Sequence, residues 1–149
     1  MQQASWQNCL EIINAIIQHP EITFICTKAN ADVGGRIINE KLKICSDEFE
    51  NVLLFDSLGM QRYMSMLASA DFVIGNSSSG IIEVPSFKIP TINIGDRQKG
   101  RIQASSVINC EPNKNDILEA IDKALSNEFK KRLRCHAIHM ETEILLIKL

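Results

Sequence analysis

Residues 73–87 have the sequence VIGNSSSGIIEVPSF, and this stretch decides the fold. The apolar run at residues 72–74 is typical of a buried strand. A glycine, an asparagine and three serines follow, and a short helical pattern then extends to residue 87. This arrangement directs backbone N–H groups and serine hydroxyls at one point, at the positive end of a helix dipole. The stretch therefore predicts a strand, a phosphate-binding turn and a helix.

The same alternation of apolar runs and helical patterns extends along the whole chain. Buried strands are predicted at residues 22–26, 52–55, 72–74, 91–94 and 106–110, and helices near residues 6–17, 37–44, 63–67, 79–87 and 115–125. This rhythm predicts one α/β domain, with a Rossmann-like parallel sheet and helices on both faces. Ligands of such sheets bind beyond the carboxyl ends of the strands. The serines and the loop at residues 95–101 both follow strands directly, so we expect them at the same edge.

The composition is that of a soluble globular domain. The chain has 149 residues, of which 45% are hydrophobic and 23% charged. Its formal charge of −2 gives no basic surface for nucleic acid, and no apolar run is long enough to span a membrane. The first residues lack the pattern of a signal peptide, and the five cysteines are scattered without a Cys-x-x-Cys pair. We therefore expect a cytoplasmic protein with reduced thiols, and no metal, cofactor, nucleic acid or membrane partner.

The serine-rich turn has a purely structural alternative, because Ser and Asn are the preferred N-caps of helices. One hydroxyl is enough for a cap. Residues 76–79 (Asn-Ser-Ser-Ser) supply more polar groups than capping requires. This excess favours phosphate binding over capping alone.

Charged residues near this turn complete the parts of a nucleotide-sugar site. Glu83 follows Ser77 by six residues, and its carboxylate can hold sugar hydroxyls, although it is also compatible with a solvated helix position. Arg97, Lys99 and Arg101 can neutralise phosphate or serve as ordinary surface charges. Their shared edge with the serines favours the first role. No carboxylate pair and no nucleophile–histidine pair can be argued, so no catalytic residue is predicted.

Two motifs resemble those of the hydrolysing UDP-N-acetylglucosamine 2-epimerases, enzymes of sialic acid and related nonulosonic acid synthesis. The motifs are GNSSSGIIEVPSF at residues 75–87 and PTINIGDRQKGR at residues 90–101. Segments 27–39 and 57–65 also fit the family. In the family these stretches belong to the C-terminal half of a two-domain, glycosyltransferase-B-like fold. The resemblance implies that residues 1–134 are a partial UDP-binding C-terminal domain.

The family's reaction implies roles for individual residues. UDP is eliminated from UDP-N-acetylglucosamine, and water adds to the resulting glycal to give N-acetylmannosamine and UDP. By motif position, Ser77 and Ser78 would hold the diphosphate and Glu83 the ribose hydroxyls. Arg97 would neutralise phosphate charge as UDP departs. Together with the neighbouring residues of the turn and the loop, the full expected substrate-binding set is Asn76, Ser77, Ser78, Ser79, Gly80, Glu83, Arg97 and Arg101.

The chain departs from the family in two ways. The family enzyme is much longer and carries its acid–base carboxylates mainly in an N-terminal domain. Its closing Asn-Pro-Tyr-Gly-Asp-Gly-Asn motif is replaced here by AIHMETEI at residues 137–144. One choice of codons for these residues, shifted by two bases, encodes the family motif. We hypothesise a frameshift before Ala137, which would leave residues 135–149 as a poorly packed tail without selected function; the coding DNA tests this.

The sequence thus predicts the UDP-binding half of a hydrolysing UDP-N-acetylglucosamine 2-epimerase, with UDP or UDP-N-acetylglucosamine as its ligand. We expect no turnover by this half alone, because the substrate cleft needs both domains. Three alternatives remain: an epimerase for another UDP-acetamido sugar such as a diacetamido bacillosamine, a non-catalytic nucleotide-sugar-binding module, and a non-functional gene fragment. The sequence leaves open a separate N-terminal chain or a homo-oligomer as partner.

Overall fold

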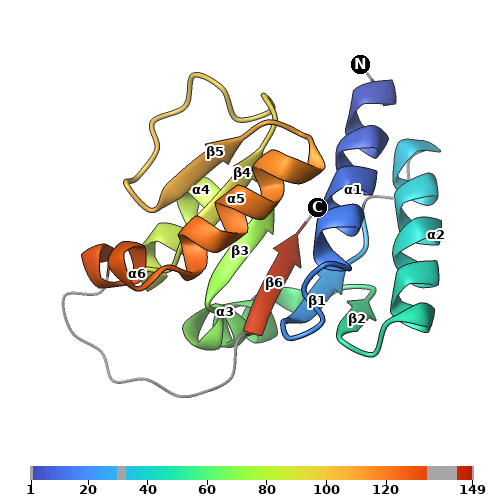
Figure 1. Ribbon diagram of the computed structural model, residues 1–149, viewed down its shortest axis with the longest axis horizontal. Coiled ribbons are helices and arrows are strands. Elements are labelled where there is room, and N and C mark those ends of the chain that lie inside the picture. Colours follow the sequence, from blue (N-terminus) through green and yellow to red (C-terminus); the bar gives the residue numbers. More distant parts are fainter. Residues whose placement is uncertain (1, 30–32, 134–143, 149) are drawn as a thin grey trace.

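The computed structural model describes residues 2–29, 33–133 and 144–148 of the chain (Figure 1). In chain order the elements are α1 (Gln2–Ile16), β1 (Thr23–Thr27), α2 (Val33–Glu48), β2 (Val52–Phe55), α3 (Gly59–Ser69), β3 (Phe72–Gly75), α4 (Ser79–Ile82), the 3₁₀-helix η1 (Val84–Phe87), β4 (Thr91–Ile94), β5 (Val107–Cys110), α5 (Lys114–Leu125), α6 (Asn127–Leu133) and β6 (Ile144–Lys148). Each strand expected from the sequence is present, within one or two residues of its predicted bounds. No described helix is long and apolar enough to cross a membrane.

The strands form one sheet with the order β2-β1-β6-β3-β4-β5, and every pairing is parallel. The α/β fold class with a parallel sheet is therefore confirmed. Because all strands run in the same direction, the turns after β3 and β4 lie at the same edge of the sheet. Their register is close, with Val73 opposite Thr91 and Gly75 opposite Asn93.

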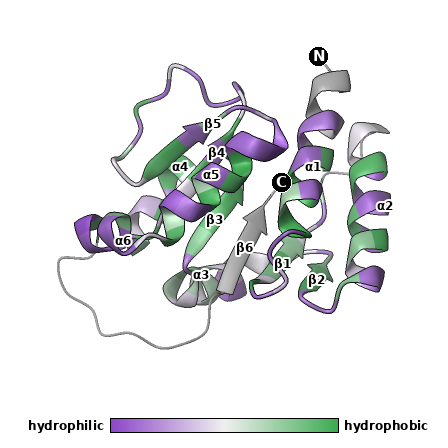
Figure 2. Cartoon of the chain, viewed as in Figure 1, coloured by the Kyte–Doolittle hydropathy of each residue, from purple (hydrophilic) through white to green (hydrophobic). Residues whose placement is uncertain are grey.

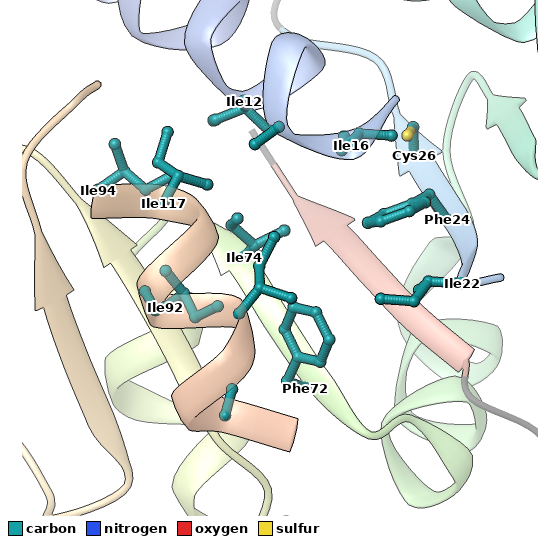
Figure 3. Close-up of a cluster of buried hydrophobic side chains, with 14 of the residues drawn as sticks. Ile12, Ile16, Ile22, Phe24, Cys26, Phe72, Ile74, Ile92, Ile94 and Ile117 are labelled. Atoms are coloured by element: carbon teal, nitrogen blue, oxygen red, sulfur yellow. The ribbon is translucent and has the colours of Figure 1, made fainter. Parts of the chain in front are cut away.

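Helices pack on both faces of the sheet, and the strand residues alternate between two cores. Phe72 and Ile74 belong to the larger core, under α1, α2 and α5, whereas Val73 between them belongs to the smaller core with α3 and η1. Figure 3 shows the larger core, in which Phe24 of β1 and Phe72 of β3 are both fully buried. Strands buried on both faces are almost entirely apolar, as the green strands of Figure 2 show.

The segment after residue 143 contributes a strand where the sequence predicted none. β6, with the sequence ILLIK, lies between β1 and β3, so that Leu146 is opposite both Ile25 and Val73. Figure 1 shows this strand at the middle of the sheet. Residues 134–143, including most of the substituted motif, lie outside the described residues. The frameshift itself stays a prediction about the coding DNA.

The helix predicted near residues 79–87 is divided into two short pieces. α4 contains four residues, and η1 begins at Val84 with Pro85 in its first turn. Proline has no N–H to bond to the carbonyl of Ile81 and disfavours α geometry at the residue before it. The α-helix therefore ends after one turn, and its dipole is weaker than that of the longer helix that the sequence suggested.

Candidate functional site

The turn after β3, residues 75–79, is called the serine loop here. Ser78 stands at the N-cap position of α4, but its side chain makes no capping hydrogen bond to a described residue. The Ser77 hydroxyl accepts a long hydrogen bond from the Ser79 amide, at 3.4 Å. Ser77 and Ser78 are both half-buried. Capping therefore leaves the Ser78 hydroxyl uncommitted, as phosphate binding requires.

The loop after β4 contacts the serine loop directly. The Gln98 side-chain amide donates to the Asn76 carbonyl at 2.9 Å, and Arg97 Nη1 donates to Asn76 Oδ1 at 3.3 Å. Gln98 is buried, whereas Arg97 is exposed above this contact. Gly95, with φ +72°, makes the sharp turn by which the chain leaves β4. The expectation that these two loops share one edge is confirmed, although sequence reasoning did not single out Gln98.

A close approach at Gly80 fixes α4 against the sheet. A Cβ at Gly80 would lie 2.7 Å from Thr91 Cγ2, and the Thr91 hydroxyl donates to the Gly80 carbonyl at 2.8 Å. Only glycine fits this contact without a shift of the neighbouring strand. Gly80 therefore has a packing role beside the binding role expected from the sequence.

Glu83 is the outer end of a chain of hydrogen bonds. The Ser79 hydroxyl donates to Glu83 Oε2, and Tyr63 of α3 shares a second hydrogen bond with the same hydroxyl. Ser79 and Tyr63 are buried, and Glu83 is half-exposed. Burial raises the pKa of Tyr63 above its usual value; the hydrogen bond with Ser79 lowers it in part, and the negative charge of Glu83 raises it. Tyr63 lies in one of the segments that resemble the family, but no sequence pattern indicated its hydroxyl.

Lys99 and Arg101 lie on a different side of the loop from Arg97. They line a cavity of about 740 Å³. Its other charged lining residues are Asp96, Glu111, Asp116, Glu119 and Lys123. None of the described residues that line it belongs to the serine loop. Arg101 is therefore placed apart from the rest of the predicted substrate-binding set.

Cys110 also lines this cavity, and its thiol is affected by the nearby charges. Burial raises the pKa of the Cys110 thiol to about 12, and the negative charges of Asp116 and Glu111 contribute to the rise. Carboxylates that disfavour a thiolate also disfavour a phosphate. Asp116 and Glu111 therefore oppose a negative charge at the Cys110 position of this cavity.

The edge near β1 contributes less to the site. Residues 30–32 lie outside the described residues, and Arg36 is exposed on α2. Asn39 of α2 clamps the turn after β1 by bonding to both the amide and the carbonyl of Ala29, at 2.8 and 3.1 Å. Within residues 2–29, 33–133 and 144–148, no cluster of His, Cys, Asp and Glu is placed to hold a metal ion.

The fold is that of an α/β protein of the Rossmann-like class, in which ligands generally bind beyond the carboxyl ends of the strands. Comparison with known proteins identifies the family. A family model described as UDP-N-acetylglucosamine 2-epimerase matches residues 1–141, and the chain belongs to this family. The resemblance found in the two motifs is thereby confirmed.

Several relatives are similar over most of this chain. A GDP/UDP-N,N'-diacetylbacillosamine 2-epimerase (hydrolyzing) from Campylobacter jejuni is 50% identical over 110 residues, which is 73% of this chain and 28% of the relative. The polysialic acid biosynthesis protein P7 from Escherichia coli is 44% identical over 106 residues, 71% of this chain and 27% of the relative. A UDP-N-acetylglucosamine 2-epimerase from Neisseria meningitidis is 37% identical over 98 residues, 65% and 25% respectively. The matched part thus spans less than a third of each relative.

Proposed function

We propose that this chain is the UDP-binding part of a hydrolysing UDP-N-acetylglucosamine 2-epimerase, which produces N-acetylmannosamine and UDP. One observation carries the proposal: Asn76 joins the loops after β3 and β4, and its side chain holds the exposed Arg97 guanidinium at the serine loop. Family membership supports the nucleotide-sugar ligand. The matched part is less than a third of the relatives' length. We therefore propose the epimerase activity for the whole enzyme and not for this chain by itself.

In this proposal the diphosphate binds at the serine loop. Hydroxyls of Ser77 and Ser78 donate to phosphate oxygens, and Arg97 contributes charge-assisted hydrogen bonds. When the bond from the sugar C1 to the β-phosphate oxygen breaks, negative charge grows on the departing UDP. A guanidinium already fixed at Asn76 stabilises that charge without reorganising, and so lowers the barrier to elimination. The proton transfers require acid–base groups that this chain does not provide in an identifiable form, so we expect binding without turnover.

A second candidate differs only in the sugar. The identity of 50% to the Campylobacter jejuni protein favours a UDP-linked diacetamido sugar as substrate. The UDP contacts are the same in both candidates, because Ser77, Ser78 and Arg97 address phosphate alone. Competition of the two UDP-sugars for the assembled enzyme separates them. If the chain is instead part of a non-catalytic binding module, neither sugar should be converted.

The test is a titration of the purified chain with UDP, followed by ¹H–¹⁵N NMR, with ADP as the control ligand. We expect shifts at Ser77, Ser78, Glu83 and Arg97 that UDP causes and ADP does not. The Arg97→Ala variant should weaken binding, whereas Lys131→Ala, an exposed cation on α6, should not. A well-dispersed spectrum without UDP-induced shifts contradicts the proposal.

A further inference from the structure

The hydrogen bonds from Tyr63 through Ser79 to Glu83 join three parts of the fold. Tyr63 belongs to α3, Ser79 is the first residue of α4, and Glu83 is the residue that separates α4 from η1. The backbone closes the same turn, because the Glu83 amide donates to the Ser79 carbonyl at 2.9 Å. Main chain and side chain therefore both tie Glu83 to Ser79.

The donors of both side-chain hydrogen bonds, Tyr63 to Ser79 and Ser79 to Glu83, can be assigned. An ionised carboxylate only accepts, so the Ser79 hydroxyl must donate its single hydrogen to Glu83 Oε2. The Ser79 oxygen can then only accept from Tyr63, whose hydroxyl must donate. The raised pKa of Tyr63 keeps that donor protonated at neutral pH. The hydroxyl hydrogen of Tyr63 therefore points to Ser79, and the hydroxyl hydrogen of Ser79 points to Glu83.

The three hydrogen-bonded side chains differ in burial in a way that suits ligand binding. Tyr63 and Ser79 are each 5% exposed, so water does not compete for their hydroxyls. Glu83 is half-exposed, and its second oxygen, Oε1, makes no hydrogen bond to another described residue. A free glutamate side chain loses rotamer freedom on binding a ligand, which lowers affinity by about tenfold. Here that freedom is already restricted in the unliganded protein.

We propose that Tyr63 and Ser79 are positioning residues that hold the Glu83 carboxylate for the vicinal hydroxyls of a ribose. This assignment rests on the proposed function and deepens it, since it names the groups that set a preference for ribose over a deoxygenated sugar. Tyr63 and Ser79 act through Glu83 and do not touch the nucleotide's sugar. Glu83 makes the contact, and the two buried hydroxyls determine its position.

The experiment measures one ratio on the full chain: the Kd for 2′,3′-dideoxy-UDP divided by the Kd for UDP, by calorimetry or NMR titration. We expect about tenfold preference for UDP in the unmodified chain, as hydrogen bonds to a charged group provide. Tyr63→Phe keeps the buried ring and should reduce the preference to about threefold. Ser79→Ala removes both hydrogen bonds and should bring it to about one. Ser65→Ala removes an exposed hydroxyl of α3 that bonds within its own helix, and should change nothing.

The affinity for 2′,3′-dideoxy-UDP separates positioning from a general structural role. Positioning predicts that Tyr63→Phe leaves this affinity unchanged within about twofold and weakens UDP selectively. Equal weakening of both ligands, or an unchanged ratio in both variants, overturns the assignment while the proposed function stands. If the unmodified chain binds neither ligand, the proposed function and the assignment fail together.

Discussion

The two sides of the loop after β4, residues 95–101, differ in what their cations face. On one side Arg97 donates a hydrogen bond to the side chain of Asn76 in the serine loop. On the other side Lys99 and Arg101 line a cavity that also contains four carboxylates, those of Asp96, Glu111, Asp116 and Glu119. Lys99 is already paired with Asp96 at 3.9 Å. Cations that are neighbours in sequence therefore differ in their capacity to bind an anion, because local carboxylates neutralise some of them and not others.

The largest expected effect is on the free energy of unfolding, which should respond differently to a substitution on each side of the loop. Gly80→Ala, on the side of the serine loop, should lower the free energy of unfolding by about 3 kcal/mol, since the new methyl group meets Thr91. Gly100→Ala, on the other side, has open space at its Cβ and only the strain of φ +82°, so about 1 kcal/mol is expected. Denaturant unfolding measures both. In a Thr91→Ser background, which removes the clashing methyl, the Gly80→Ala penalty should decrease; equal losses at the two glycines would contradict the comparison.

The next effect concerns the anion itself. Arg97→Ala should weaken UDP binding by about tenfold, because a charge-assisted hydrogen bond to phosphate is lost. Arg101→Ala should weaken it by less than about twofold, since its charge is offset by nearby carboxylates and exposed to solvent. Both are measured by titration at one fixed ionic strength. Equal losses would show that the cavity side also contacts the diphosphate.

The smallest effect concerns the potential within the cavity. Asp116→Asn removes a negative charge that raises the pKa of Cys110. The pKa should fall, a larger fraction of thiolate should form at pH 8, and alkylation at Cys110 should proceed about two to three times faster. Peptide mass spectrometry after timed exposure to iodoacetamide gives the rate. Asp122→Asn, an exposed carboxylate on the same helix, is the matched control; the same acceleration in both variants would show that Asp116 has no specific influence.

The fold could be predicted where the information is local. Mostly apolar runs of three to five residues indicated the strands from β1 to β5, and their regular alternation with helices indicated a parallel sheet. β6 was not predicted, although residues 144–148 are a similar apolar run, because the substituted motif before it led to the expectation of a poorly packed tail. The division of the helix near residues 79–87 had a visible signal in Pro85, which the apolar pattern around it obscured.

The meeting of the two loops that carry the candidate site could be predicted, and the contacts within them less well. The edge shared by the serine loop and Arg97 follows from strand direction, which a parallel sheet fixes. The separation of Arg101 from Arg97 does not follow, since a loop without periodicity gives no direction for its side chains. Tyr63 illustrates the same limit: its helix was expected, but the contact between its hydroxyl and Ser79 depends on how α3 and α4 pack.

The position of β6 has a consequence for the order in which the molecule is made. The middle strand of the sheet is the last of the six in chain order, so β1 with β2, and β3 with β4 and β5, are synthesised before the strand that joins them. Until then the facing edges of β1 and β3 have no ladder partner, and such edges readily pair with other chains. Until residues 144–148 are synthesised, the gap between the two half-sheets can therefore accept a strand from another chain.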